Sequence, residues 1–261
     1  MKLTPWQKRG RVFLKRFMYS QLYLRDAFMQ ILGREKPLVK FKVEADPPSI
    51  YFNFELDPER VPHLAQELDL PFPLARIRCL EGEEPFYCIT LNIYRVSGLV
   101  NGLRAEWSIY IEDDEGVPRY LVVDAQSDVR SLDSVHLLTD PGDVTHAHNA
   151  GSLDSTAVAE DGGRFESSLS PLDSGPLVAP HAEWIEANDY IYWLSGVCDR
   201  TFYDSGMARP RARLVETGNV KIADSTRWGA MALPEPRHVI LYENAIEFAM
   251  SPWWNIDDVK A

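Results

Sequence analysis

Residues 85–125 read PFYCITLNIYRVSGLVNGLRAEWSIYIEDDEGVPRYLVVDA, and this stretch decides the predicted fold. Side chains alternate with a period of two over residues 87–94, which is typical of a strand with two different faces. A turn-rich segment, 97–102, then reverses the chain, and a second alternating run covers residues 104–111. After an acidic turn, residues 120–123 supply a third strand. We therefore predict three consecutive antiparallel strands.

The second of these strands carries a polar face. Arg104, Glu106 and Ser108 share one side of it, whereas Trp107 and Ile109 lie on the other. If the polar face meets solvent, the pattern is that of an ordinary antiparallel sheet. If it lines a cavity, Arg104 and Glu106 are ionisable groups aimed at a ligand. The alternation by itself leaves both interpretations open.

The run GLRAEWSIYI, residues 102–111, resembles a segment of the acetoacetate decarboxylase-like superfamily in which a glycine and a spaced glutamate open a central strand. The preceding order is also similar, with a strand at 51–56, a short helix opened by DPER at 57–60, and a proline-bearing link into another strand. The resemblance covers residues 48–125. It implies an α+β, mainly β fold, in which a large antiparallel sheet is closed or half-closed into a cone- or barrel-like domain.

The same resemblance supplies candidate site residues. The family's cavity glutamate falls on Glu106, which would act as an acid/base group or a hydrogen-bond acceptor. Arg104 would orient a carboxylate, and further candidate substrate-binding residues are Asn92, Tyr94 and Tyr110. A buried carboxylate needs a partner, and the nearest ones in sequence are Arg104, Arg95 and Tyr94. If Glu106 is a cavity group that serves function, Glu106→Gln creates no cavity and removes no helix cap, so we expect it to change stability by no more than about 1 kcal/mol.

The chain departs from the family at the catalytic lysine. Members of the family form a Schiff base through a lysine in a Gly-Phe-Pro-Lys-like loop after the central strands, whereas no lysine lies between Glu44 and Val220 here. Arginine cannot replace it, because its guanidinium stays protonated. We therefore expect a pocket for a small carboxylated or keto-bearing molecule without Schiff-base decarboxylation and without a cofactor. Any enzymatic activity would be a lyase- or hydrolase-type reaction on a small keto or carboxylic acid.

The remaining elements are predicted from the periodicity of apolar residues and from the turn residues that flank each segment. The segment 184–193 is aromatic and fits either a helix or a strand, and Gly218-Asn219 suggests a hairpin between residues 211–215 and 220–222. Other expected elements are strands at 36–44, 50–56, 76–80, 165–169 and 239–242, and a short helix at 58–68.

Composition and cysteine content limit the classes of protein to which this chain can belong. Of the 261 residues, 45% are hydrophobic and 11% aromatic, which suits a packed core. No apolar run is long enough to span a bilayer. The three cysteines are odd in number and form no CxxC pair, which argues against a disulfide framework or a zinc ribbon. A cytoplasmic protein is the expectation.

Charge divides the chain into two parts. Residues 1–40 carry ten Lys/Arg and two Asp/Glu, a net charge of +8, and residues 41–261 carry seventeen and thirty-seven, a net charge of −20. The acidic body argues against nucleic acid as a partner. We predict a basic amphipathic helix over residues 1–35 and a single domain over 36–261. The helix either packs on its own body or a sister subunit, as in a homo-oligomer, or residues 1–33 make a peripheral membrane contact.

The alternative function also depends on that helix: the chain would be a non-catalytic protein that binds an apolar ligand, and the helix would dock it on a membrane or a partner.

A separate motif is the HxH pair, His146 and His148, which would share one face of a strand and present two imidazoles to a metal. His136, Asp143 or Asp154 would supply a third ligand. The signal is weak, because two histidines in a polar segment are more often solvated, and we predict no metal site.

Overall fold

The structure is a computed structural model that describes residues 41–70, 72–97, 101–129, 142–188, 190–193, 196–204 and 211–250. The predicted helix over residues 1–35, with its membrane and subunit contacts, lies outside the described residues. Within the described ranges, no helix is long and apolar enough to cross a membrane.

The three predicted central strands are present. They are β3 (Phe86–Ser97), β4 (Gly102–Glu112) and β5 (Pro118–Ser127), and each pairs antiparallel with the next. Asp113 closes the turn between β4 and β5, where its Oδ1 accepts the backbone N–H of Glu115 and of Val117, each at 3.0 Å. The period of two and the turn residues were sufficient to predict this meander.

A single long strand organises the large sheet around this meander. β1 (Phe41–Leu56) spans 16 residues, where the sequence predicted two strands. It pairs with β3 along one edge. Along its other edge it pairs first with β15 (Ile246–Met250) and then with β14 (Ala232–Tyr242).

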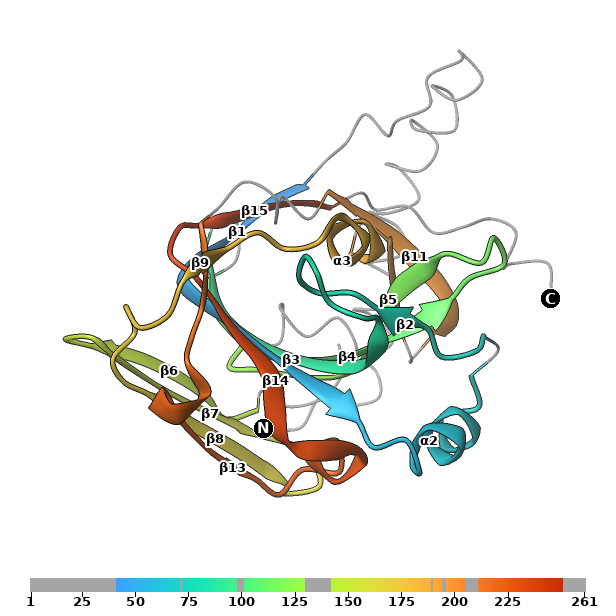
Figure 1. Ribbon diagram of the computed structural model, residues 1–261, viewed down its shortest axis with the longest axis horizontal. Coiled ribbons are helices and arrows are strands. Elements are labelled where there is room, and N and C mark those ends of the chain that lie inside the picture. The colour runs from blue at the N-terminus through green and yellow to red at the C-terminus, as the bar shows by residue number, and fades with distance from the viewer. Residues whose placement is uncertain are drawn as a thin grey trace, which may run out of the picture.

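In the described residues, the large sheet contains eleven strands in the order β2-β3-β4-β5-β10-β11-β15-β1-β14-β12-β9. Figure 1 labels all of them except β10 and β12. The strands not yet named are β2 (Arg76–Ile77), β9 (Leu177–Val178), β10 (Tyr190–Trp193), β11 (Gly196–Asp204) and β12 (Ala212–Leu214). The additional β1–β3 pairing folds the sheet back on itself. The sheet nevertheless ends on two short edge strands, β2 and β9, so it is not a simple closed barrel. The mainly β class is confirmed and the barrel is not.

A second, four-stranded sheet has the order β13-β8-β7-β6. Its strands are β6 (Val144–Asn149), β7 (Ser152–Val158), β8 (Arg164–Leu169) and β13 (Val220–Asp224). The predicted hairpin around Gly218-Asn219 is wrong. Residues 217–219 form a 3-10 helix, and the flanking strands β12 and β13 belong to different sheets. A local turn signal does not report which sheet each flanking strand joins.

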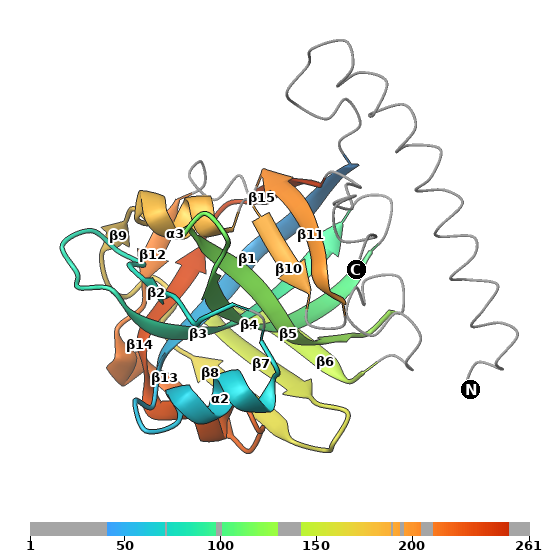
Figure 2. The same ribbon diagram turned by 90° about the vertical axis from the view of Figure 1, so that its right-hand side faces the viewer.

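The two α-helices of the described chain are short, namely α2 (Val61–Glu67) and α3 (Ala182–Ala187). The ambiguous aromatic segment 184–193 contains both predicted alternatives, since its first part lies in α3 and its last part in β10. His181 caps α3, because its Nδ1 accepts the backbone N–H of Glu183 at 3.2 Å. Figure 2 shows the two helices well separated, with α3 at the upper left of the body and α2 at its bottom.

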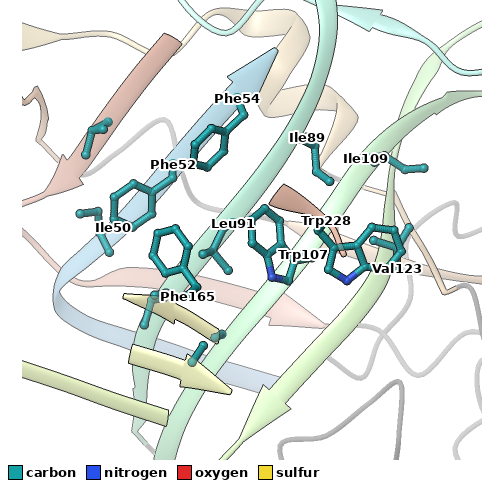
Figure 3. Close-up of a cluster of buried hydrophobic side chains, with 14 of the residues drawn as sticks. Ile50, Phe52, Phe54, Ile89, Leu91, Trp107, Ile109, Val123, Phe165 and Trp228 are labelled. Atoms are coloured by element: carbon teal, nitrogen blue, oxygen red, sulfur yellow. The ribbon is translucent and has the colours of Figure 1, made fainter. Parts of the chain in front are cut away.

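The small sheet packs on one face of the large sheet (Figure 3). There Phe165 of β8 meets Phe52 of β1, with ring centroids 5.1 Å apart, and Trp107 of β4 at 6.0 Å. Phe52, Trp107 and Phe165 are each at most 1% exposed. Full burial of each large apolar side chain stabilises the fold by about 1.5–3 kcal/mol before entropic costs. This apolar contact fixes which side of β4 faces away from the small sheet.

A second hydrophobic cluster lies on that opposite face. It contains buried aromatic side chains from four strands and from α3: Tyr51, Tyr110, Tyr120, Trp184 and Tyr242. Both faces of the central strands are thus buried. The solvent-facing interpretation of the polar side of β4 is therefore wrong, since Arg104 and Glu106 are buried on this side.

Candidate functional site

We call the second buried side of the large sheet the inner face. Cross-strand register defines it, because directly opposed residues of paired strands project to the same side. Tyr51, Asn92 and Glu106 form one row across β1, β3 and β4. The adjacent row, two residues along each strand, contains His238 of β14 beside the inner-face residues Asn53, Thr90 and Ser108.

An ion pair between Arg104 and Glu106 lies on the inner face. Arg104 Nε donates to Glu106 Oε2 at 2.8 Å, and Arg104 Nη2 lies 2.7 Å from the same oxygen. The two residues are 3% and 5% exposed. Arg104 Nη1 also donates to Ser127 Oγ of β5 at 3.3 Å. The predicted arginine partner of Glu106 is thus confirmed, and the charges of the pair offset each other.

Two tyrosines and an amide surround the carboxylate. The Tyr120 hydroxyl donates to Glu106 Oε1 at 3.1 Å and accepts Asn92 Nδ2 at 3.4 Å. Burial, followed by the negative charge of Glu106, raises the pKa of Tyr120 well above its ordinary value. Burial likewise raises the pKa of Tyr51, against the opposing effect of Asn92. Both phenols therefore remain protonated. Tyr120 acts toward the Glu106 carboxylate as a neutral hydrogen-bond donor and does not become a phenolate.

The other predicted residues lie at different points of the same strands. Tyr110 is fully buried, and its hydroxyl accepts the indole N–H of Trp184 from α3. Tyr94 is partly buried and packs against Phe248, with ring centroids 6.1 Å apart. Arg95 is exposed and is opposed to Leu103, so it projects to the other face of the sheet from Glu106. The structure thus brings Arg104, Glu106 and Asn92 together, whereas the ligand-binding roles predicted for them, for Tyr94 and for Tyr110 stay predictions.

Sequence reasoning missed several residues of the inner face. Tyr120 was predicted only as part of a strand, although its hydroxyl contacts Glu106. Asn53 interrupts the apolar run Ile50–Phe54 of β1, and such a polar residue in an apolar strand was a usable signal. No local signal marked His238 or Trp184, because each reaches this face through pairing or packing between segments distant in the sequence.

The HxH pair does not form a metal centre with a third ligand in the part of the chain that is described. His146 uses both ring nitrogens, since Nε2 lies 2.7 Å from the Pro48 carbonyl oxygen and Nδ1 lies 2.8 Å from Ser155 Oγ. A carbonyl only accepts, so Nε2 carries the proton and donates it, while Nδ1 accepts from the serine. His148 is exposed. Burial lowers the pKa of His146 below the usual histidine value.

Among the side chains that the structure describes, groups suited to covalent catalysis are not placed beside Glu106. Lys221, the only lysine between residues 43 and 259, is exposed on β13 of the small sheet. Cys79 and Cys88 are buried free thiols, and burial, together with the neighbouring Cys88, raises the pKa of Cys79. A protonated thiol is a poor nucleophile. The chemistry that the described residues of the inner face support is hydrogen bonding and proton transfer.

No protein-family model and no curated protein matches this chain. Among solved structures, it is similar to the acetoacetate decarboxylase of Legionella pneumophila subsp. pneumophila, with a TM-score of 0.54 and 9% identity over 85% of this chain and 90% of that one. A second acetoacetate decarboxylase structure aligns with a TM-score of 0.46 and 13% identity over 84% of this chain and 91% of its own. The first likeness establishes a shared fold, and the resemblance inferred from residues 48–125 is confirmed at that level. Function does not follow from fold.

Proposed function

We propose that this chain, which has an acetoacetate decarboxylase-like fold, binds a small keto-bearing or carboxylated molecule at the Arg104–Glu106 pair. The folded-back large sheet would enclose this molecule in a cone- or barrel-like interior. Schiff-base decarboxylation is not part of the proposal, because the one lysine of the long central region lies on the small sheet. Any turnover would be of lyase or hydrolase type.

The observation that carries the proposal is the buried polar network of Arg104, Glu106, Tyr120 and Asn92. Removing two charges from water costs several kcal/mol per ion, and well-packed apolar residues would usually stabilise the core as well or better. Polar groups retained at such a cost on the inside of a curved sheet are candidates for a functional site. The likeness in fold to a family of decarboxylases supports the same assignment by analogy only.

The geometry suggests a role for each group. Glu106 would accept a hydrogen bond or a proton from the ligand, and Arg104 would bind an oxygen of its keto or carboxyl group. Tyr120 holds Glu106 in place, and Asn92 in turn donates to the Tyr120 hydroxyl. Because Arg104 and Glu106 already neutralise each other, a ligand carboxylate would bring an extra negative charge. A keto oxygen would not, so we expect keto-bearing molecules, or acids bound together with a proton, to be favoured.

A second candidate function has its own support. The rest of the inner face is largely aromatic, as in proteins that bind an apolar ligand; its aromatic side chains are Tyr51, Tyr110, Trp184 and Tyr242. In that case the ion pair would be structural. The protein would bind an apolar probe such as a medium-chain fatty alcohol, and keto acids would not compete with it.

Binding by matched tyrosine variants tests the first proposal. Tyr120→Phe removes only the hydroxyl that holds Glu106, whereas Tyr242→Phe removes a buried hydroxyl with no hydrogen-bond partner in the described chain. With acetoacetate or 2-oxobutyrate in a calorimetric titration, we expect binding to the wild type. It should weaken by about tenfold in Tyr120→Phe and be unchanged in Tyr242→Phe. Equal binding by both variants, or no binding by the wild type, would contradict the proposal.

A further inference from the structure

A second polar row crosses the inner face beside the Glu106 row. His238, Asn53, Thr90 and Ser108 are directly opposed on β14, β1, β3 and β4. All four are buried, with His238 3% exposed and the others fully buried. In the described chain, Asn53 Nδ2 and His238 Nδ1 have no hydrogen-bond partner. Buried polar atoms are rarely left unpaired, because each then loses its hydration without compensation.

A chain of hydrogen bonds sets the orientation of Asn53. The Trp184 indole N–H only donates, and it donates to the Tyr110 hydroxyl. The Tyr110 hydroxyl oxygen lies 3.5 Å from Thr90 Oγ1, which donates in turn to Asn53 Oδ1 at 2.9 Å. Because the Thr90 proton is used for Asn53, the Tyr110 hydroxyl donates to Thr90, and each group in the series donates to the next one toward Asn53. The amide oxygen of Asn53 is thus occupied, and its NH2 group is left as a buried donor.

His238, in contrast, has an unpaired acceptor in place of an unpaired donor. Its Nε2 lies 2.6 Å from Glu83 Oε1. Burial lowers the pKa of His238, although Glu83 acts in the other direction, and so favours the neutral ring. A carboxylate accepts, so the single ring proton is on Nε2. Nδ1 is therefore a buried acceptor.

The donor and the acceptor are neighbours. Asn53 and His238 are directly opposed across β1 and β14, where side chains that share a face have Cβ atoms about 5 Å apart. A hydroxyl group satisfies both, because its oxygen accepts from Asn53 and its proton is donated to His238. A carboxylate or keto oxygen would leave the imidazole unpaired, and an ammonium group would leave the amide unpaired.

We propose that Asn53 and His238, with Glu83 fixing the imidazole, form a subsite for a hydroxyl group of the bound molecule. This inference rests on the proposed function, because it places the hydroxyl on the same inner face as the Arg104–Glu106 pair. The two rows are two residues apart along each strand, about 7 Å, and Asn53 lies two strands from Glu106. The ligand class is therefore a small hydroxylated keto or carboxylic acid whose two polar ends are separated by several carbon atoms.

Pairs of acids with and without a terminal hydroxyl test the subsite. The probes are straight-chain carboxylic acids of four to eight carbons, each compared with its ω-hydroxy counterpart, such as hexanoate and 6-hydroxyhexanoate. At the chain length that fits, we expect the hydroxy acid to bind at least about tenfold more tightly, as two neutral hydrogen bonds in a buried site should give. Both acids of a pair carry the same carboxyl group, so a change that affects only the binding of this group leaves the ratio of the two affinities unchanged.

Variants assign that preference to the proposed residues. Asn53→Asp removes the donor, and Thr90→Val removes the hydroxyl that orients the amide, so both should bring the ratio close to one. Ser167→Ala is the matched control, because it removes a buried hydroxyl on the small sheet that has no hydrogen-bond partner among the described residues. It should leave the ratio unchanged. A preference that survives both inner-face variants would overturn the proposal.

Nitrogen-15 NMR of the wild-type imidazoles keeps the proposal testable if a variant does not fold. The Nδ1 resonance of His238 should shift on addition of 6-hydroxyhexanoate and not of hexanoate. If both acids bind equally and neither moves this resonance, an enclosed water satisfies Asn53 and His238, and the subsite is disproved while the proposed function stands. If no acid of either series binds, the subsite is disproved; if acetoacetate and 2-oxobutyrate do not bind either, the proposed function itself fails.

Discussion

Arg104 and Glu106 lie two residues apart on β4, and their side chains meet on one oxygen, with Nε 2.8 Å and Nη2 2.7 Å from Oε2. Neither residue is more than 5% exposed. The pair is thus a structural unit as well as a candidate site. The expectation from sequence that Glu106→Gln would be nearly neutral treated Glu106 as a cavity group, and the buried guanidinium with which it pairs requires that expectation to be revised.

The first prediction concerns the stability of the pair. Glu106→Gln leaves a buried guanidinium without its counter-charge, so it should lower the free energy of unfolding by about 3 kcal/mol. The double variant Arg104→Met/Glu106→Gln removes both charges and should recover most of that loss. Urea unfolding of the wild type, Glu106→Gln, Arg104→Met and the double variant measures the coupling. Additive losses from the two single changes would show that the pair does not interact as described.

The second prediction concerns pH and His146. Burial lowers its folded-state pKa, so the folded chain resists a proton that the unfolded chain accepts below about pH 6.5. Stability is therefore lost as the pH falls below that value. Replacing His146 with Gln should reduce the loss between pH 7 and pH 5, measured by urea unfolding at each pH. His148→Gln, at an exposed position of the same strand, removes only the smallest of the contributions to the lowered His146 pKa and should keep most of the wild-type dependence; equal slopes in both variants would contradict the assignment.

The third prediction concerns covalent chemistry. Schiff-base formation needs a neutral amine beside the bound carbonyl group, whereas Lys221 is exposed on β13. Incubation with acetoacetate and borohydride should therefore leave the mass of the folded protein unchanged. The same treatment of unfolded protein gives the background from surface amines. A stoichiometric adduct found only on the folded protein would restore the Schiff-base mechanism.

The central meander could be predicted from sequence because its information is local. The period of two in residues 87–94 and 104–111, and the turn at 112–116, determined β3, β4 and the link to β5. The side-chain alternation of β4 also predicted that Arg104 and Glu106 share a face. It could not decide whether that face is buried, since burial depends on α3 and on strands far away in the sequence.

The rest of the site required pairing between distant segments. Tyr120 reaches Glu106 through the β4–β5 register, and His238 reaches Asn53 through the β1–β14 register. A shift of one residue in either pairing would place the side chain on the opposite face. The failed hairpin at Gly218-Asn219 has the same cause, because the strand after it pairs with β8 instead of with the strand before it.

The most direct test of the account is a crystal structure of the protein with 2-oxobutyrate or acetoacetate at saturating concentration. We predict the keto acid on the inner face, with an oxygen within hydrogen-bond distance of Arg104 and a polar atom beside Glu106. Side chains that fill this face completely, with the acid absent or bound elsewhere, would contradict the account. Arg104 and Glu106 would then be a buried structural ion pair and nothing more.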